Sequence, residues 1–349
     1  MTRKTVIIAF FNNKGGVSKT TTCFHVGWKL ADMGKSVVMV DLDPQCNLSG
    51  LALEISNERN FEDVARDMKG RNVYDSLLPA MKSLGEKITS PECPEVAGNP
   101  NLRILLGNVK MAEVETQLAT AMNMGSILPA IQNVPGSFDE LYKQIGERYD
   151  ADFLLLDMSP SLGALNQVNL FNSDFFIVPM MPDIFSVMAI SSLARVLPDW
   201  KKWAEKVKVL NLFDDEDLVY GFNPRIPKFL GTVIQRYNLR RGMPTRSFNK
   251  YIEELKEAIS STLVPGLAGA GMLGDSIECE SSATNLAMIP DFNSLIAAAQ
   301  TNRKPVFKLE EDDLSTGGAA AEGQLENIRK FDQIFEQMAS AIIERTQVH

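Results

Sequence analysis

Residues 5–22 read TVIIAFFNNKGGVSKTTT, and this stretch decides the fold. The β-branched and aromatic run over residues 5–11 predicts a buried strand, and a helical pattern continues through Met33. Between them lies a glycine turn that ends in Lys19 and Thr20. A strand, a glycine turn, a Lys-Thr pair and a helix in this order are the context of a phosphate-binding loop. The stretch therefore predicts a phosphate site at the start of a parallel α/β sheet.

Each residue type in this loop suits phosphate chemistry. Gly15 and Gly16 let backbone N–H groups approach phosphate oxygens, and the helix N-terminus adds partial positive charge. Lys19 reaches the β- and γ-phosphates, and the Thr20 hydroxyl can ligate Mg²⁺. The predicted nucleotide-binding residues of the loop are Gly15, Gly16, Val17, Ser18, Lys19, Thr20 and Thr21.

The loop departs from the common pattern GxxxxGK[ST], because Asn13 and Ser18 stand where its two glycines would fall. It satisfies the variant KGGxxK[ST] from Lys14 to Thr20. By this variant the chain resembles the ParA/MinD family of deviant Walker A ATPases, which are P-loop NTPases of the SIMIBI type. The resemblance implies that Lys14 reaches across a nucleotide-sandwich dimer to the partner's ATP, so Lys14 and Lys19 are candidate catalytic residues. ParA-like loops usually read KGGVGKTT, and Ser18 would be mildly strained if its position requires a positive φ.

A second buried strand, near residues 36–41, ends in the sequence DLDPQCN. Parallel sheets keep their chemistry at the carboxyl ends of their strands. This segment looks like the family's DxDPQGN motif, which implies that Asp41 supports the Mg²⁺ shell and that the catalytic residue Asp43 orients the attacking water. Phosphoryl transfer itself requires a positioned nucleophile and neutralised charge. Cys46 stands where a glycine is usual, and we assign it no redox role.

A third carboxylate, Asp157, closes the apolar strand 153–157. An aspartate in this position is typical of a Walker B strand, where it holds Mg²⁺ directly or through water. The predicted metal ligands are therefore Thr20, Asp41 and Asp157.

Strand and helix patterns alternate along the chain, which predicts a doubly wound, mainly parallel sheet flanked by helices. The fold of the resembled family agrees. We expect a single domain over residues 1–349, with a helical and loop insertion at about 55–100 and a C-terminal helix at about 324–345. The late strand 230–235 resembles the family strand whose end contributes an amide to adenine, so Gln235 is the candidate for that contact. The expected strands lie near residues 5–11, 36–41, 102–106, 153–157, 175–179, 207–211, 230–235 and 286–289.

Composition excludes several classes of protein. The 349 residues include 35 Lys and Arg and 44 Asp and Glu, a formal net charge of −9, which excludes a uniformly basic nucleic-acid coat protein. No run of 18 apolar residues and no signal-peptide pattern occur, so we expect a cytoplasmic protein, associated with the nucleoid if it binds DNA. Four widely spaced cysteines and two histidines favour neither a disulfide framework nor a cysteine-built metal site.

The resemblance also implies ATP and Mg²⁺ as cofactors, an ATP-bound homodimer, and a stimulating partner protein. ParA-like proteins bind non-specific DNA through basic residues late in the chain. A solvated helix face explains such a cluster equally well. A membrane target is not expected, because the C-terminal helix mixes acidic and basic residues on its polar face. The candidate DNA patch is Arg236, Arg240, Arg241, Arg246 and Lys250.

These features predict an ATP-dependent dimerising switch for DNA partition or intracellular cargo positioning, with slow, partner-stimulated ATP hydrolysis that resets the dimer. One alternative is a regulatory module that uses nucleotide state to act on a protein partner. Another is a deviant-Walker metabolic synthetase or kinase, which would have a polar substrate pocket and no affinity for DNA. Lys14 together with the DLDPQ segment favours the partition type. The sequence does not specify whether the cargo is a plasmid, a chromosome, a protein complex or a defence system.

Overall fold

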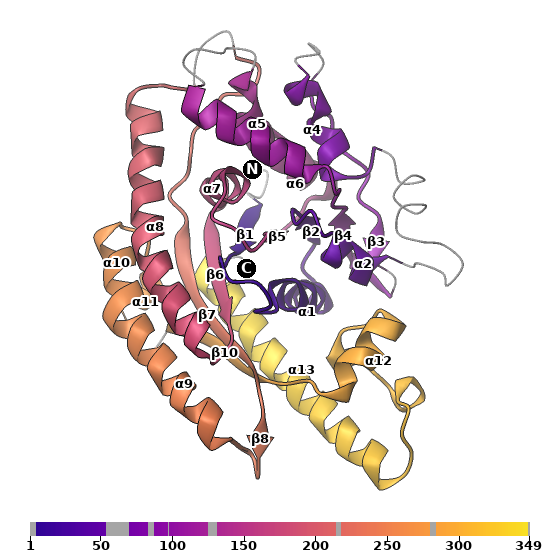
Figure 1. The fold of residues 1–349 in the computed structure, drawn as a ribbon. Helices are drawn as coiled ribbons and strands as arrows, with labels where there is room; N and C mark the ends of the chain where they lie inside the picture. The colour runs from indigo at the N-terminus through magenta and orange to yellow at the C-terminus, as the bar shows by residue number, and fades with distance from the viewer. Residues whose placement is uncertain are drawn as a thin grey trace.

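A computed structural model describes residues 5–53, 70–82, 87–96, 98–124, 131–213, 218–279 and 284–347. Their strands form one eight-stranded sheet in the order β10-β7-β6-β1-β5-β2-β4-β3, together with a small β8–β9 hairpin (Figure 1). All neighbours in the large sheet are parallel except β3, which is antiparallel to β4. The strands are β1 (Val6–Phe10), β2 (Val37–Asp41), β3 (Glu95–Val96), β4 (Asn99–Leu105), β5 (Phe153–Asp157), β6 (Phe175–Met180), β7 (Lys228–Tyr237), β8 (Leu239–Arg240), β9 (Met243–Pro244) and β10 (Asn285–Pro290).

The sheet is buried on both faces, as the apolar runs of its strands require. Successive side chains of a strand point to opposite faces, so Ile7 and Ala9 of β1 enter one hydrophobic core and Ile8 and Phe10 enter the other. Each core is closed by a layer of helices. The predicted doubly wound, mainly parallel sheet flanked by helices is therefore confirmed.

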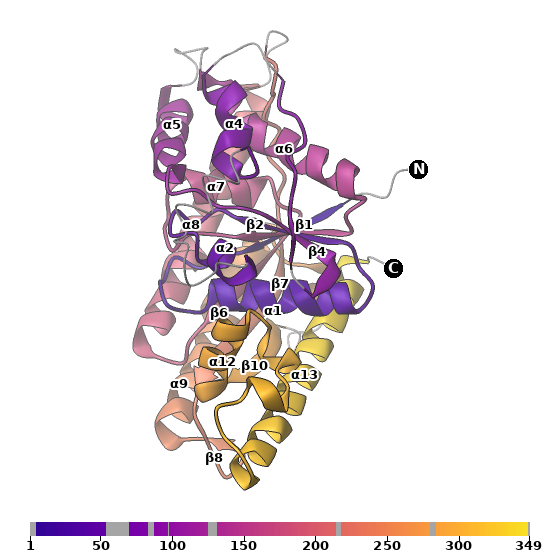
Figure 2. The same ribbon diagram turned by 90° about the vertical axis from the view of Figure 1, so that its right-hand side faces the viewer.

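Helices α4 to α7 and most of α8 pack on one face, and α1, α2, α12 and α13 pack on the other. Figure 2 views the sheet nearly along its plane, with α4, α5 and α6 on one side and α1 and α13 on the other. The helices are α1 (Lys19–Asp32), α2 (Asn47–Ala52), α4 (Val73–Met81), α5 (Met111–Met124), α6 (Asn133–Tyr149), α7 (Ala164–Phe171), α8 (Ile184–Val209), α9 (Arg246–Ala258), α10 (Val264–Gly269), α11 (Asp275–Cys279), α12 (Ser294–Asn302) and α13 (Ala319–Thr346). No helix in the described parts of the chain combines the length and apolarity needed to cross a bilayer.

The strand predicted over residues 207–211 is wrong. These residues end α8 and the turn after it, where the Leu210 N–H donates to the Lys206 carbonyl. The alternation of lysine and apolar residues is typical of a strand, but Val209 is 80% exposed and so does not line a buried sheet face. The C-terminal helix begins earlier than predicted, at Ala319, and much of the expected insertion at 55–100 lies outside the described residues.

Strand register brings the chemistry-bearing strand ends to one edge. Phe10 of β1 and Asp41 of β2 both pair with Asp157 of β5. Because all three strands are parallel, the loop that follows β1 starts beside the two aspartates. The fold thus places the predicted phosphate loop and metal ligands together.

Candidate functional site

The phosphate loop joins β1 to α1 and lines a cavity of about 750 Å³. Gly16 has φ +73°, and Ser18 has φ 59° and ψ 35°, so the position of Ser18 does require the left-handed backbone that glycine adopts most easily. The Asn12 side chain fixes the start of the loop, because its Nδ2 donates to the Pro179 carbonyl at 2.7 Å and its Oδ1 accepts from the Lys14 N–H at 2.9 Å.

The cavity gathers most of the predicted nucleotide contacts. It also includes Asp43, which lies 8% exposed at its wall. Gly15 and Lys14 do not line the cavity. Its lining residues from the phosphate loop are Gly16, Val17, Ser18, Lys19, Thr20 and Thr21.

Lys19 lies at the base of the cavity and is 6% exposed. Its Nζ donates to the Lys14 carbonyl at 3.2 Å. Burial lowers the pKa of Lys19, while the nearby Asp157 and Asp43 carboxylates partly offset that shift. The ammonium therefore sits where it can meet phosphate oxygens and the buried carboxylates together.

Asp41 is fully buried beneath the loop and is held by hydrogen bonds. Its Oδ2 accepts from the Ser49 N–H at 2.8 Å and from Ser49 Oγ at 2.7 Å. Burial, only partly offset by these Ser49 bonds, raises the pKa of Asp41 to about 6. Gly107 permits this close packing, because a Cβ there would lie 2.9 Å from Asp41 Cγ.

Asp157 is the least satisfied polar group of the site. Its side chain is fully buried, and among the described residues neither carboxylate oxygen has a hydrogen-bond partner. Burial raises the pKa of Asp157 well above its usual range, and the Asp41 carboxylate raises it further. The nearby Thr20 hydroxyl lowers this pKa, although it lies outside hydrogen-bond geometry with both Asp157 oxygens.

An orphaned buried carboxylate beside a second carboxylate and a hydroxyl fits a divalent cation. No three carboxylate, imidazole or thiol groups converge closely enough in the described structure to hold a metal ion alone. A site with two carboxylates and one hydroxyl suits Mg²⁺, which typically takes one or two protein carboxylates and completes its shell with water and substrate phosphates. The residues present therefore fit the ion.

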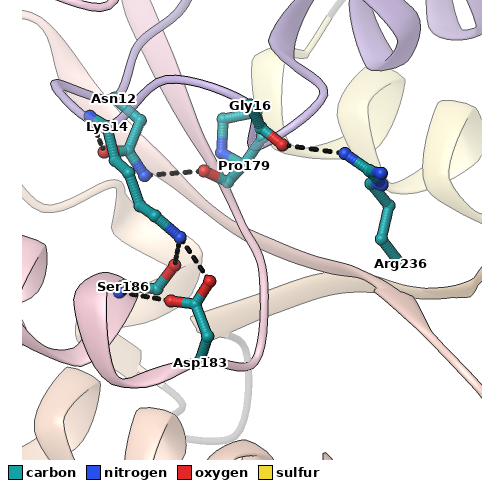
Figure 3. A network of polar contacts seen from close by, with 7 residues as sticks. All are labelled: Asn12, Lys14, Gly16, Pro179, Asp183, Ser186 and Arg236. Carbon is teal, nitrogen blue, oxygen red and sulfur yellow. Dashed lines mark hydrogen bonds and ion pairs between the residues drawn. The ribbon is translucent and has the colours of Figure 1, made fainter.

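Two predicted site residues, Gln235 and Arg236, contact the phosphate loop directly. Gln235 is 2% exposed, and its Nε2 donates to the Val17 carbonyl at 2.7 Å. This buried hydrogen bond stabilises the backbone of the phosphate loop. The Gln235 carboxamide also bonds the Thr22 hydroxyl, and its adenine contact stays a prediction. Arg236 lines the same cavity as the phosphate loop, and its Nη1 donates to the Gly16 carbonyl at 3.1 Å (Figure 3). The other candidate DNA-binding residues lie outside this cavity, exposed on the β8–β9 hairpin and α9.

Comparisons with known proteins agree with this geometry. A family model described as an AAA domain matches residues 5–209. The sporulation initiation inhibitor protein Soj of Bacillus subtilis is 30% identical over 194 residues, which cover 55% of this chain and 64% of Soj. The chain belongs to the ParA/MinD-type family of P-loop ATPases.

Solved structures show the same fold over nearly the whole chain. Protein DIP2308 from Corynebacterium diphtheriae has a TM-score of 0.67 at 20% identity and covers 98% of both chains. The structure of pNOB8 ParA bound to nonspecific DNA has a TM-score of 0.54 at 16% identity and covers 99% of both chains. The match to Soj reaches less than two thirds of that protein's length.

The structure of this ParA/MinD-type ATPase also shows site residues that the sequence did not reveal. Glu115 of α5 accepts from the Ala164 N–H at 2.7 Å and the Leu165 N–H at 2.9 Å, so it holds the N-terminus of α7. The Asn166 side chain donates to the Ser159 carbonyl at 2.7 Å and thereby fixes the loop after β5. Glu115 lies 49 residues before Ala164 in the sequence, and Asn166 lies seven residues after Ser159, but neither belongs to a motif with a recognisable spacing.

Replacing Asp157 by Asn is expected to raise the free energy of unfolding of the nucleotide-free and Mg²⁺-free protein by about 1 to 3 kcal/mol near pH 8. The physical reason is the raised pKa of Asp157, which makes folding costlier as pH rises from the ordinary carboxyl range through the folded-state pKa. The wild type should therefore lose stability over this rise in pH, and the Asp157→Asn variant should lose less. Denaturant unfolding at several pH values measures both.

The matched control is Asp174→Asn, since Asp174 Oδ2 accepts from the Ile7 N–H at 3.0 Å and its carboxylate also lies near Arg225. Removing that satisfied carboxylate should destabilise the protein. Equal losses of stability in both variants would show that the Asp157 carboxylate is not a source of strain.

Proposed function

We propose that this chain is an ATP-dependent dimerising switch that partitions DNA or positions an intracellular cargo, with ATP hydrolysis resetting the dimer. The observation that carries the proposal is the cavity itself. Residues of the KGGxxK[ST] loop and Asp43 line this cavity together. The buried carboxylates of Asp41 and Asp157 lie nearby, at the ends of adjacent parallel strands. This arrangement suits phosphoryl transfer, which depends on positioning and electrostatic stabilisation more than on covalent help.

We assign roles to the residues by their positions. The loop N–H groups of residues 16–21 and Lys19 hold the phosphates, and Asp43 positions the attacking water at the cavity wall. Thr20, Asp41 and Asp157 would hold Mg²⁺, directly or through water. When bound there, the ion supplies neutralisation of phosphate charge.

The proposal also includes binding of duplex DNA by the dimer. Its support is the exposed basic surface of Arg240, Arg241, Arg246 and Lys250, together with the likeness to pNOB8 ParA. Two copies brought side by side would double this charge, so the dimer should bind duplex DNA more tightly than the monomer. We also propose a cytoplasmic location and a separate protein that stimulates hydrolysis.

The test is binding to random-sequence duplex DNA with ATP, with ADP and without nucleotide, over a salt series, while sedimentation records the oligomeric state. We expect a dimer and DNA binding with ATP alone. The slope of log affinity against log salt is negative, and the double variant Arg240→Ala, Arg241→Ala should reduce its magnitude by up to about four, because each phosphate contact contributes roughly one and the dimer loses four arginines. Lys14→Ala should bind ATP as a monomer.

The control is Lys202→Ala, which removes an exposed lysine of α8 that is outside the patch. It should leave the salt slope unchanged. An ATP dimer that ignores DNA would refute the DNA-binding part and point to a protein track. A monomer under all nucleotide conditions would refute the switch itself.

A further inference from the structure

Glu115 of α5 caps a helix to which it does not belong. Its Oε1 accepts from the Ala164 N–H at 2.7 Å and its Oε2 accepts from the Leu165 N–H at 2.9 Å, at the start of α7. The N-cap residue of α7 is Gly163, which has no side chain to accept these bonds. A carboxylate at a helix N-terminus satisfies N–H groups that have no partner within the helix and meets the positive end of the helix dipole. The first turn of α7 therefore depends on a side chain of α5, which packs against it (Figure 1).

Gly163 leaves the space that this carboxylate occupies. A Cβ at Gly163 would lie 2.3 Å from Glu115 Oε1, far inside van der Waals contact, and the three atoms nearest to that Cβ all belong to the Glu115 carboxyl group. The backbone of Gly163 has φ −85° and ψ 176°, which alanine adopts without strain. A methyl group at this position would therefore act mainly by displacing the carboxylate.

The loop that joins Asp157 to α7 runs beside the phosphate loop. Its Pro160 lines the cavity, and a Cβ at Gly15 would lie 3.7 Å from Pro160 Cβ, an ordinary van der Waals contact. The loop also begins directly after the buried Asp157. A shift of this loop would therefore disturb the cavity next to the phosphate loop.

The first turn of α7 holds the loop 158–163 in place. Asn166 Nδ2 donates to the Ser159 carbonyl at 2.7 Å and to the Ser161 carbonyl at 2.9 Å, and Asn166 is fully buried. Asn166 is the third residue of α7, so its position follows that of the turn that Glu115 caps. A continuous set of hydrogen bonds thus leads from Glu115 through α7 to the loop at the cavity.

We propose that Glu115 is a positioning residue for ATP hydrolysis, because it holds the first turn of α7 and thereby keeps the loop after Asp157 in place beside the phosphate loop. The proposal rests on the ATPase activity proposed above. Phosphoryl transfer is sensitive to placement, since a displacement of about 1 Å can cost roughly a hundredfold in rate. The groups assigned to phosphate binding lie on the phosphate loop and α1 instead. Loss of Glu115 should therefore lower kcat much more than it changes the KM for ATP.

Glu115→Ala should lower kcat about ten- to a hundredfold while the KM for ATP stays within about threefold. Glu115→Gln keeps one oxygen that can accept from α7 but loses the charge, so its kcat should lie between those of Glu115→Ala and the wild type. The matched control is Glu113→Ala on the same helix, which removes a carboxylate that accepts from the Tyr74 hydroxyl at 2.8 Å. This control should keep its kcat.

Gly163→Ala tests the same contact from the side of α7. In the wild-type background the added methyl group should displace the Glu115 carboxylate and lower kcat severalfold. In the Glu115→Ala background there is no carboxylate to displace, so Gly163→Ala should have little further effect. Effects that multiply in the double variant would show that the two residues act independently and would refute the proposal.

Amide hydrogen exchange of the nucleotide-free protein measures the contact without turnover. In Glu115→Ala the Ala164 and Leu165 N–H groups lose their acceptor, so peptides that cover residues 158–166 should exchange at least about threefold faster than in the wild type. Peptides from α13, which packs on the other face of the sheet, should exchange at an unchanged rate.

The outcomes distinguish the failure of this proposal from the failure of the ATPase function. If the wild type hydrolyses ATP and the kcat of Glu115→Ala stays within about threefold of it, the positioning role is refuted. A raised KM with an unchanged kcat would make Glu115 a residue for nucleotide binding and would overturn the proposal. A wild type without turnover would refute the ATPase function and the positioning role with it. Unchanged exchange in Glu115→Ala would refute the contact itself, whether or not the wild type hydrolyses ATP.

Discussion

Replacing Lys19 by Met is expected to weaken ATP binding by about a hundredfold or more. Lys19 is 6% exposed at the base of the cavity, close to Asp157 and Asp43, so its ammonium is the charge that offsets those carboxylates. Without it, the phosphates would enter a site with two uncompensated carboxylates and no lysine donor at its base. Methionine keeps the length of the side chain and removes only the charge. Titration calorimetry with ATP and Mg²⁺ measures the change.

The control is Lys29→Met on the same helix. Lys29 is also 6% exposed, but it pairs with Asp332 on α13 and does not line the cavity. This variant should lose stability and keep its ATP affinity. Retention of affinity within a factor of about three in Lys19→Met would contradict the assignment of Lys19 to the phosphates.

Replacing Asp43 by Ala is expected to lower ATP turnover by about a hundredfold or more while ATP binding persists. Asp43 lies at the wall of the cavity, where its Oδ1 accepts from the Gln45 N–H at 3.0 Å. Its second oxygen is the group that we assign to the attacking water. Since binding of ATP would be intact and the reset would fail, the ATP-bound dimer should accumulate. Phosphate release and sedimentation measure the two effects.

Asp43→Asn distinguishes chemistry from local structure. Its amide oxygen can still accept from the Gln45 N–H and so keeps the turn, but it lacks the negative charge. Both variants should be slow if the carboxylate positions the water. Normal turnover in Asp43→Asn would show that only the turn is needed and would remove Asp43 from the catalytic residues.

Most of the fold could be predicted from the sequence because its elements are local patterns. The apolar runs of β1, β2 and β5 identify buried strands, and the glycine turn before Lys19 identifies the phosphate loop. The prediction of a strand over residues 207–211 was wrong, because alternating apolar and charged residues are also compatible with the exposed end of a long helix. Periodicity over five residues does not separate these two states.

The sequence by itself determined the family and its loop, since KGGxxK[ST] and the strand-end aspartates lie within a few residues of the elements that position them. Tertiary structure alone decided which groups meet across the fold. Lys14 and Asp183, which form an ion pair, are 169 residues apart, and Gly16 and Arg236 are 220 apart. Asp183-x-x-Ser186 does indicate a helix start, but nothing in that spacing names Lys14 as the ion-pair partner of Asp183. Such contacts depend on the order of the strands and the packing of the helices. These are set by the burial of apolar side chains on both faces of the whole sheet, not by any local stretch of sequence.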